Sequence, residues 1–180
     1  MKKIFLFMLC LVLCVSFVGC IEESSPRKEI LDTESATTTS GSKTETEKTE
    51  TVFGLNEVAV FETLKFTALE IKESGGENFF KPEEGNTFVG VKFEVENISN
   101  EEQTVSTVLL FEGYADDVQC KYSFNANCAF SDGKLDGTIA PGKKLIGWYA
   151  LEVPANWQEI ELDVQSSWLS DSTAKFVFQK

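Results

Sequence analysis

The chain has 180 residues, of which 29 are acidic and 16 are basic, and it contains no histidine. The formal net charge of −13 makes nucleic acid and anionic lipid surfaces unfavourable partners, because like charges repel. Without histidine the chain cannot form the Ser-His or Cys-His pairs of nucleophilic enzymes, and most zinc-site interpretations are weakened.

The amino terminus has the layout of an export signal. Lys2 and Lys3 precede an apolar run over residues 4–18, and Gly19 follows it. The run is shorter than the roughly 20 apolar residues that a membrane-spanning helix needs. We therefore expect residues 1–19 to be a signal peptide that is removed.

A cysteine at the end of this run distinguishes it from an ordinary secretory signal. Residues 17–20 (FVGC) resemble the prokaryotic lipobox, in which the cysteine is diacylated and the signal is cut just before it, although Phe17 replaces the usual leucine. Stable anchoring takes two acyl chains, which such a cysteine carries. The resemblance implies that Cys20 is lipidated and anchors the protein on the extracytoplasmic face of the cell membrane. The alternative is a plain secretory peptide that contains a cysteine by chance.

Residues 20–51 follow as a polar segment rich in Thr, Ser, Glu and Lys. Such a composition cannot bury enough apolar surface to offset the entropy of ordering. We expect the segment to be a disordered tether with a reach on the order of 30 Å. Removing the signal takes away two lysines and no acid, so 14 basic and 29 acidic side chains remain and the mature net charge is −15.

The cysteines divide by position. Cys10 and Cys14 lie in the signal, whereas Cys120 and Cys128 form an even pair in the exported domain, where such pairs are usually disulfides. A bridge between them would close a loop of about nine residues and contribute roughly 2–3 kcal/mol in the chain-entropy model. The spacing is not Cys-x-x-Cys, which argues against a redox-active pair. We therefore predict a Cys120–Cys128 disulfide.

Residues 52–180 are expected to form one domain, because about 130 residues suffice for a hydrophobic core. Their hydrophobic pattern has a period of two, as in residues 89–95, 159–165 and 175–179, which predicts strands with one buried face. The pattern changes phase near Thr67 and Ala68, which predicts a β-bulge.

Further strands are predicted at residues 57–61, 104–111, 119–124 and 144–153. Turn signals separate them at residues 75–76, 97–102, 132–133 and 141–142. No segment has a convincing amphipathic helical pattern. The fold class is therefore all-β, with an antiparallel sandwich expected and a closed barrel as the alternative.

Two stretches resemble a known family. They are residues 86–106 (NTFVGVKFEVENISNEEQTVS) and residues 140–154 (APGKKLIGWYALEVP). Both are similar to the Ig-like domain of unknown function, family 4352, which follows lipoboxes and Thr/Ser-rich tethers in prokaryotic surface proteins and is similar in fold to the immunoprotective extracellular protein superfamily. The resemblance implies an Ig-like β-sandwich outside the cytoplasm and supplies no catalytic residues.

Trp148 is the most prominent candidate for recognition. It shares the polar parity of its strand with Ile146, whereas Tyr149 and Leu151 share the apolar parity, so Trp148 faces outward or lies under a covering loop. An outward tryptophan beside Ile146 would form a recognition patch for peptide, glycan or a partner domain. The alternative is a covered tryptophan, because large aromatic side chains are usually mostly buried.

Two other kinds of site are suggested by single features. Asp116, Asp117, Asp132 and Asp136 fall in predicted loops where Ca²⁺ could find oxygen ligands, but no EF-hand spacing is present and solvated charge is the simpler explanation. Residues 97–99 (NIS) form an N-glycosylation sequon, which makes Asn97 a glycosylation candidate.

We therefore expect a non-catalytic, lipid-anchored cell-envelope protein that presents an Ig-like domain to an envelope partner, with no metal, no cofactor and no nucleic acid. A carbohydrate- or Ca²⁺-binding extracytoplasmic module that uses Trp148 or the acidic loops is the alternative. A hydrolase that uses carboxylates alone is a third hypothesis, but no nucleophile–base pairing is visible in the sequence.

Overall fold

The computed structural model describes residues 26–30, 51–130, 132–169 and 172–180. The predicted signal peptide, Cys20 and residues 31–50 of the predicted tether lie outside the described residues. Within the described part of the chain, no helix is long and apolar enough to cross a bilayer.

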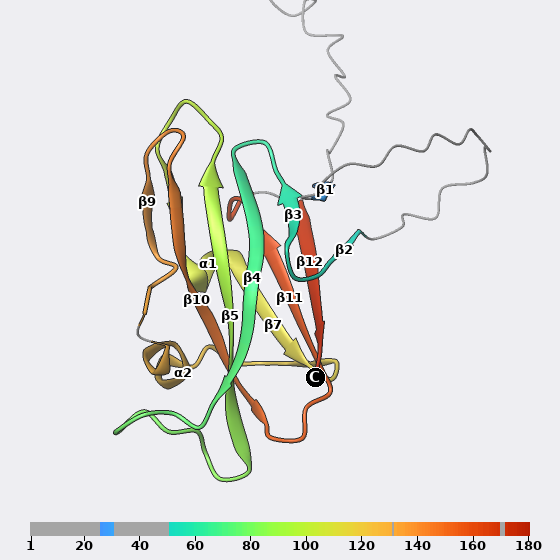
Figure 1. Ribbon diagram of the computed structural model, residues 1–180, viewed down its shortest axis with the longest axis vertical. Coiled ribbons are helices and arrows are strands. Elements are labelled where there is room, and N and C mark those ends of the chain that lie inside the picture. Colours follow the sequence, from blue (N-terminus) through green and yellow to red (C-terminus); the bar gives the residue numbers. More distant parts are fainter. Residues whose placement is uncertain (1–25, 31–50, 131, 170–171) are drawn as a thin grey trace, which may run out of the picture.

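Two five-stranded sheets pack face to face (Figure 1). The first sheet has the order β1 (Arg27–Ile30), β3 (Glu57–Val60), β4 (Leu64–Ser74), β5 (Asn86–Asn97), β10 (Lys144–Pro154). The second has the order β2 (Val52–Phe53), β12 (Thr173–Gln179), β11 (Glu159–Gln165), β7 (Phe111–Ala115), β8 (Val118–Gln119). A separate pair joins β6 (Gln103–Val105) to β9 (Gly137–Ile139). Only β2 and β12 pair in parallel among these strands, so the predicted antiparallel sandwich is confirmed.

The main core lies between the two sheets and is rich in phenylalanine. Alternate residues of β11 and of β5 from residue 91 onward are buried, as the period-two pattern predicts, whereas residues 88–91 of β5 are all buried. The Phe93 ring meets Phe111 at 5.3 Å and Phe176 at 5.2 Å, both edge to face, which is a favoured geometry for aromatic pairs. These contacts join β5 of the first sheet to β7 and β12 of the second.

The predicted β-bulge is present in β4. The register with β5 shifts between Ala68 and Glu70, so Leu69 is the extra residue and its side chain is exposed. The shift returns Ile71 to the inner face, where it packs against the core.

Strand β1 corrects the predicted boundary between tether and domain. Residues 27–30 belong to the first sheet and pair antiparallel with β3, although they lie in the segment assigned to the tether. Composition alone is misleading here, because the strand is held by long-range ion pairs: Lys28 Nζ lies 2.6 Å from Glu57 Oε2, and Lys65 Nζ lies 3.2 Å from Glu29 Oε2.

Two predicted strands are interrupted by short helices. Residues 104–111 divide into the end of β6, α1 (Thr107–Leu110) and the start of β7, and the Asp136 carboxylate accepts a 2.8 Å hydrogen bond from the Thr107 N–H at the start of α1. Residues 119–124 end in α2 (Phe124–Ala129), whose first turn is capped by Ser123 Oγ, which accepts from the Ala126 N–H.

The helix α2 covers the outer face of the first sheet and creates a second, smaller core. Ala126 and Phe130 pack there against Phe88, Trp148 and Ala150. The ring of Phe130 comes so close to β5 that a Cβ built on Gly90 would lie 2.7 Å from it. Only glycine fits at this crossing without displacing Phe130.

Candidate functional site

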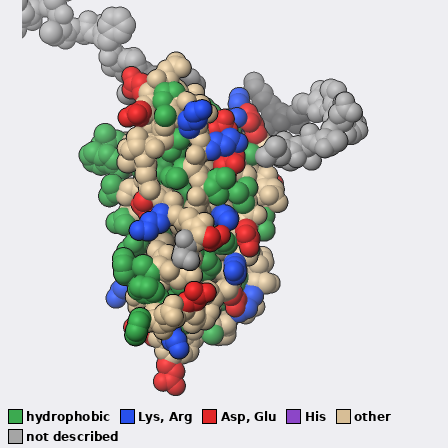
Figure 2. Space-filling view, turned by 60° about the vertical axis from the view of Figure 1, so that its left-hand side comes forward, with side chains coloured by type: hydrophobic (Ala, Val, Ile, Leu, Met, Phe, Trp, Pro, Cys, Tyr) green, Lys and Arg blue, Asp and Glu red, His purple; other side chains and the backbone are tan. Residues whose placement is uncertain are grey.

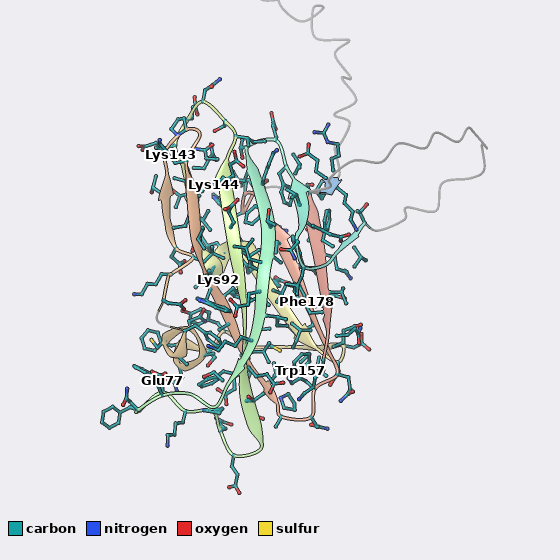
Figure 3. All side chains as sticks on the ribbon, in the orientation of Figure 1. Glu77, Lys92, Lys143, Lys144, Trp157 and Phe178 are labelled. Atoms are coloured by element: carbon teal, nitrogen blue, oxygen red, sulfur yellow. The ribbon has the colours of Figure 1, made fainter. Side chains whose placement is uncertain are left out.

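The structure buries Trp148, so the recognition patch predicted around it is wrong. The residue faces away from the main core, as its parity predicts, but it is only 5% exposed beneath the segment of α2 and Phe130. Phe130 stacks on the indole with ring centroids 4.9 Å apart, and Lys92 Nζ lies 5.2 Å from the ring centroid. Lys92 projects near the middle of the first sheet (Figure 3). Of the predicted pair, only Ile146 remains exposed.

Asn97 is fully buried, so the folded domain does not present it for glycosylation. Its Nδ2 donates to the carbonyl oxygens of Glu101 at 2.7 Å and Ile139 at 2.8 Å. Its Oδ1 accepts from the N–H of Ser99 at 2.9 Å and from Ser99 Oγ at 2.8 Å. The sequon is therefore a structural turn motif that joins β5 to the β6–β9 pair.

The structure also contradicts the predicted disulfide, because Cys120 and Cys128 are both free thiols. Cys120 stays with the second sheet, where its N–H donates to the Gly113 carbonyl at 2.8 Å. Tyr122 then forms an isolated antiparallel β-bridge with Leu151 on β10. Cys128 lies further on, in α2 on the outer face of the first sheet. The chain thus passes around the edge of β10 between the two cysteines.

Three of the four acidic residues considered for Ca²⁺ have structural partners, whereas Asp117 lies exposed in the β7–β8 turn with a φ of 65°. Asp116 Oδ1 accepts 2.9 Å hydrogen bonds from the N–H groups of Gln158 and Glu159, and Asp136 binds Thr107. Asp132 pairs with Lys92 at 3.2 Å, and this hydrogen bond is the main cause that lowers the pKa of Asp132. No group of three potential metal-ligating side chains occurs among the described residues.

A groove of about 650 Å³ lies at the end of the sandwich where β7 ends and β5 begins. It runs between the β7–β8 hairpin, the crossing segment before α2 and the end of β10. The lining residues are Glu83, Asn86, Ala115, Asp116, Val118, Gln119, Cys120, Lys121, Tyr122, Ser123, Glu152, Pro154, Asn156.

One carboxylate, that of Glu152, links the segments that form this groove. Its Oε1 accepts from the Glu83 N–H at 2.7 Å and from Asn86 Nδ2 at 3.2 Å, and its Oε2 accepts from Ser123 Oγ at 3.4 Å. These bonds hold the turn before β5 and the segment before α2 against the end of β10. Burial raises the pKa of the Cys120 thiol in the same groove, which keeps it protonated and poorly nucleophilic.

Exposed aromatic side chains lie on and beside the groove. Tyr122, in its lining, is 50% exposed, and Phe124, two residues further along, is 63% exposed. The ring of Phe80 meets that of Phe124 edge to face at 6.2 Å, and the adjacent Phe79 is 96% exposed. Figure 2 shows hydrophobic side chains gathered along one side of the domain, with charged side chains intermixed elsewhere.

The hydrophobic pattern of the sequence does not reveal this groove. Tyr122 and Phe124 were assigned to a strand, and Phe79 and Phe80 follow the turn signal at residues 75–76 without any periodic pattern. The aromatic pair Phe79 and Phe80 outside any predicted strand was the available signal, because large apolar side chains in loops are rarely explained by local structure.

A comparison with protein-family models matches residues 53–175 to a domain of unknown function, DUF4352. No curated protein matches the chain.

Solved structures of similar fold include proteins of Bacillus subtilis, Clostridium difficile and Bacillus anthracis. A Bacillus subtilis protein described as a candidate lipoprotein is 14% identical with a TM-score of 0.55 over 66% of this chain, which spans only 37% of that protein. An uncharacterised β-sandwich protein from Clostridium difficile is 15% identical with a TM-score of 0.50 over 77% of this chain and 99% of its own. A conserved protein of Bacillus anthracis is 14% identical with a TM-score of 0.50 over 68% and 94%. At these identities the likeness concerns the fold.

Proposed function

Because the chain belongs to the DUF4352 family, whose function is unknown, we propose from its own residues that it is a lipid-anchored envelope protein with a non-catalytic binding domain. The lipobox-like sequence that ends in Cys20 supports the anchor, and the similar Bacillus subtilis fold described as a candidate lipoprotein is compatible with it. The sandwich domain then acts on the extracytoplasmic side of the cell membrane.

The observation that carries the binding role is the combination of a groove with exposed aromatic side chains. Tyrosine and other aromatic residues dominate the energetics of protein interfaces, because they bury a large area with few rotatable bonds. Tyr122 and Phe124 supply such area beside a groove of about 650 Å³, which is within the range of ligand sites. Glu152 keeps the groove formed without a ligand, so binding does not have to order these segments first.

The charge of the groove indicates the chemistry of its partner. Glu83, Asp116 and Glu152 contribute carboxylates, whereas Lys121 is the only basic residue in the lining. A peptide segment or protein loop that carries basic and apolar side chains fits this surface best. Complementary charge would raise the association rate and make binding weaker at high salt.

The glycan alternative has less support from the aromatic residues. Trp148 and Trp157 are both buried, and the Trp157 Nε1–H donates to Glu73 at 2.8 Å. Among the three tryptophans of the chain, only Trp168 is exposed. A flat stacking platform made from two tryptophans is therefore absent from the described domain.

A selection of random displayed peptides tests the binding role. The bait is the chain from residue 20 onward with Cys20→Ser, which keeps every described residue. Enriched peptides should carry Lys or Arg with apolar residues, and Tyr122→Ala or Phe124→Ala should weaken their binding at least tenfold. Leu55→Ala, an exposed apolar residue in the β2–β3 turn, is the matched control. No enrichment, or peptides that bind both variants unchanged, would refute the groove as the binding site.

A further inference from the structure

Strand β1 determines where an anchored amino terminus would leave the domain. Arg27 pairs with Val60 and Ile30 pairs with Glu57, so the amino-terminal end of β1 lies beside the end of β3. Lys28 holds the strand twice, through the ion pair with Glu57 and through a 3.0 Å hydrogen bond from its Nζ to the Val52 carbonyl. The strand is thus tied to both sheets.

This docking leaves very little chain between the anchor and the domain. Only residues 21–25 separate Cys20 from Pro26. Six residue steps span at most roughly 20 Å, whatever conformation the segment adopts. A lipid on Cys20 would therefore hold the β1 side of the domain close to the bilayer surface, whose headgroup layer is itself about 5–8 Å thick.

Exposed apolar side chains lie at the same end of the second sheet. Trp168 and Leu169, in the loop between β11 and β12, are 68% and 74% exposed. This loop begins after Gln165 of β11, which pairs with Thr173 of β12. Two residues further along β12, Lys175 pairs with Val52 of β2. Because Lys28 also contacts Val52, the loop and β1 lie toward the same end of the second sheet (Figure 1).

The helix α1 adds two more apolar side chains beside that loop. Val164 pairs with Phe111, so α1, which immediately precedes Phe111, lies next to the strand end from which the loop leaves. Val108 and Leu109 are each 61% exposed. We call Val108, Leu109, Trp168 and Leu169 the apolar end patch.

We propose that the apolar end patch lies in the headgroup region of the bilayer that holds the Cys20 anchor, and this inference rests on the anchoring part of the proposed function. Tryptophan and leucine favour the boundary between headgroups and acyl chains. The short link keeps the patch at high effective concentration near that boundary, so even weak contacts are populated. The mature charge of −15 repels an anionic surface, so the occupant that we propose is a zwitterionic lipid surface.

This orientation presents the groove away from the membrane. Strand β7 begins at Phe111 beside the apolar end patch and ends at Ala115 in the lining of the groove. Figure 1 shows β7 running from the patch end toward the end that carries the carboxyl terminus. The membrane contact and the proposed binding site therefore occupy opposite ends of the second sheet.

Tryptophan quenching on vesicles tests the orientation. The lipidated chain, purified from membranes and reconstituted in phosphatidylcholine vesicles, is compared with the unlipidated Cys20→Ser chain in buffer. Because Trp148 and Trp157 are buried, Trp168 is the reporter, and Trp168→Phe identifies its signal. We expect iodide quenching of Trp168 to fall at least threefold on vesicles and acyl-chain-brominated lipid to quench it. The Val108→Ser, Leu109→Ser, Leu169→Ser combination should reduce the bromine quenching, whereas Val118→Ser at the groove should not.

The outcomes separate the orientation from the anchor. A chain that fails to float with vesicles refutes the anchor, and the orientation with it. A chain that floats but shows full iodide access to Trp168 and no bromine quenching refutes the orientation alone. Protection of Trp168 in native membranes but not on vesicles would assign the apolar end patch to a protein partner and also refute lipid contact.

Discussion

Lys28 and Glu57 form an ion pair, with Nζ and Oε2 2.6 Å apart, that joins β1, the described strand nearest Cys20, to β3 of the first sheet. The two residues are 29 positions apart and belong to neighbouring strands of the first sheet. Their contact converts part of a polar segment into structure and shortens the link between anchor and domain.

Reversing the charge of Lys28 should loosen β1. Lys28→Glu replaces attraction by repulsion at a half-buried pair, so we expect the β1 amides to exchange hydrogen about five- to tenfold faster while the β5 and β11 amides stay protected. The double variant Lys28→Glu, Glu57→Lys restores opposite charges and should recover most of the protection. Equal exchange in all three proteins would show that side-chain charge does not hold β1.

Acid should release β1 by the same mechanism. The Lys28 hydrogen bond lowers the pKa of Glu57, and the Lys65 hydrogen bond lowers the pKa of Glu29. A carboxylate whose pKa is lowered by folding stabilises the docked strand above its ordinary pKa of about 4.3, and this contribution is lost as the pH falls through the lowered value. Amide chemical shifts of β1 should therefore stay constant from pH 7 to 5 and change below about pH 4. A transition near neutral pH would contradict this assignment.

Asn97 should be among the most sensitive polar residues of the domain. Asn97→Ala removes the donors of two backbone carbonyl oxygens, so we expect the free energy of unfolding to fall by about 2–4 kcal/mol. Asn100→Ala, an exposed asparagine three residues away, should change it by less than about 0.5 kcal/mol. Urea unfolding of the unmodified protein and the two variants, fitted with one shared m-value, measures both differences in the free energy of unfolding. Similar midpoints for both variants would show that the Asn97 bonds are not important.

Gly90 should tolerate no side chain while α2 covers the sheet. A Cβ at this position would lie 2.7 Å from the Phe130 ring, so Gly90→Ala should lower the free energy of unfolding by about 1–3 kcal/mol and expose Trp148 to acrylamide. Gly54→Ala is the control, because its nearest neighbour would be 3.8 Å away. A stable Gly90→Ala protein with Trp148 still protected would contradict the packing of Phe130.

The two cysteines of the domain should react as thiols. Alkylation after denaturation without reductant should modify both Cys120 and Cys128. In the native protein, burial raises the pKa of Cys120, so its alkylation should be slow at pH 8 and should accelerate as the pH rises past the ordinary thiol value of about 8.5. If Cys120 and Cys128 both stayed unalkylated in the denatured protein, the disulfide predicted from the sequence would be present after all.

The period-two pattern was sufficient to predict the long strands and the bulge. In β5 and β11 one face meets the main core, so the alternation of residues is direct evidence of the fold. The other face meets solvent or polar neighbours, except at Phe88 and Gly90 of β5, which lie under the α2 segment. The outward parity of Trp148 was also correct. A covered Trp148 was the alternative to an outward patch, but the covering element could not be identified, because α2 is short and the second core depends on Phe130 approaching Gly90.

The elements that the sequence did not reveal are held by contacts distant in the chain. Strand β1 depends on Glu57 and Lys65, and the start of α1 depends on Asp136, 29 residues after Thr107. The groove depends on Glu152, which joins Glu83 and Ser123, 69 and 29 residues away. Local propensity cannot detect such partners, and isolated acidic residues give no periodic signal.

The lipid anchor on which the proposed function depends is tested by the mass of the amino-terminal peptide from the membrane-bound protein. We expect this peptide to begin at Cys20 and to carry two acyl chains on the glyceryl-modified thiol, with residues 1–19 absent. A peptide that begins at Met1, or an unacylated Cys20 in the membrane fraction, would contradict it.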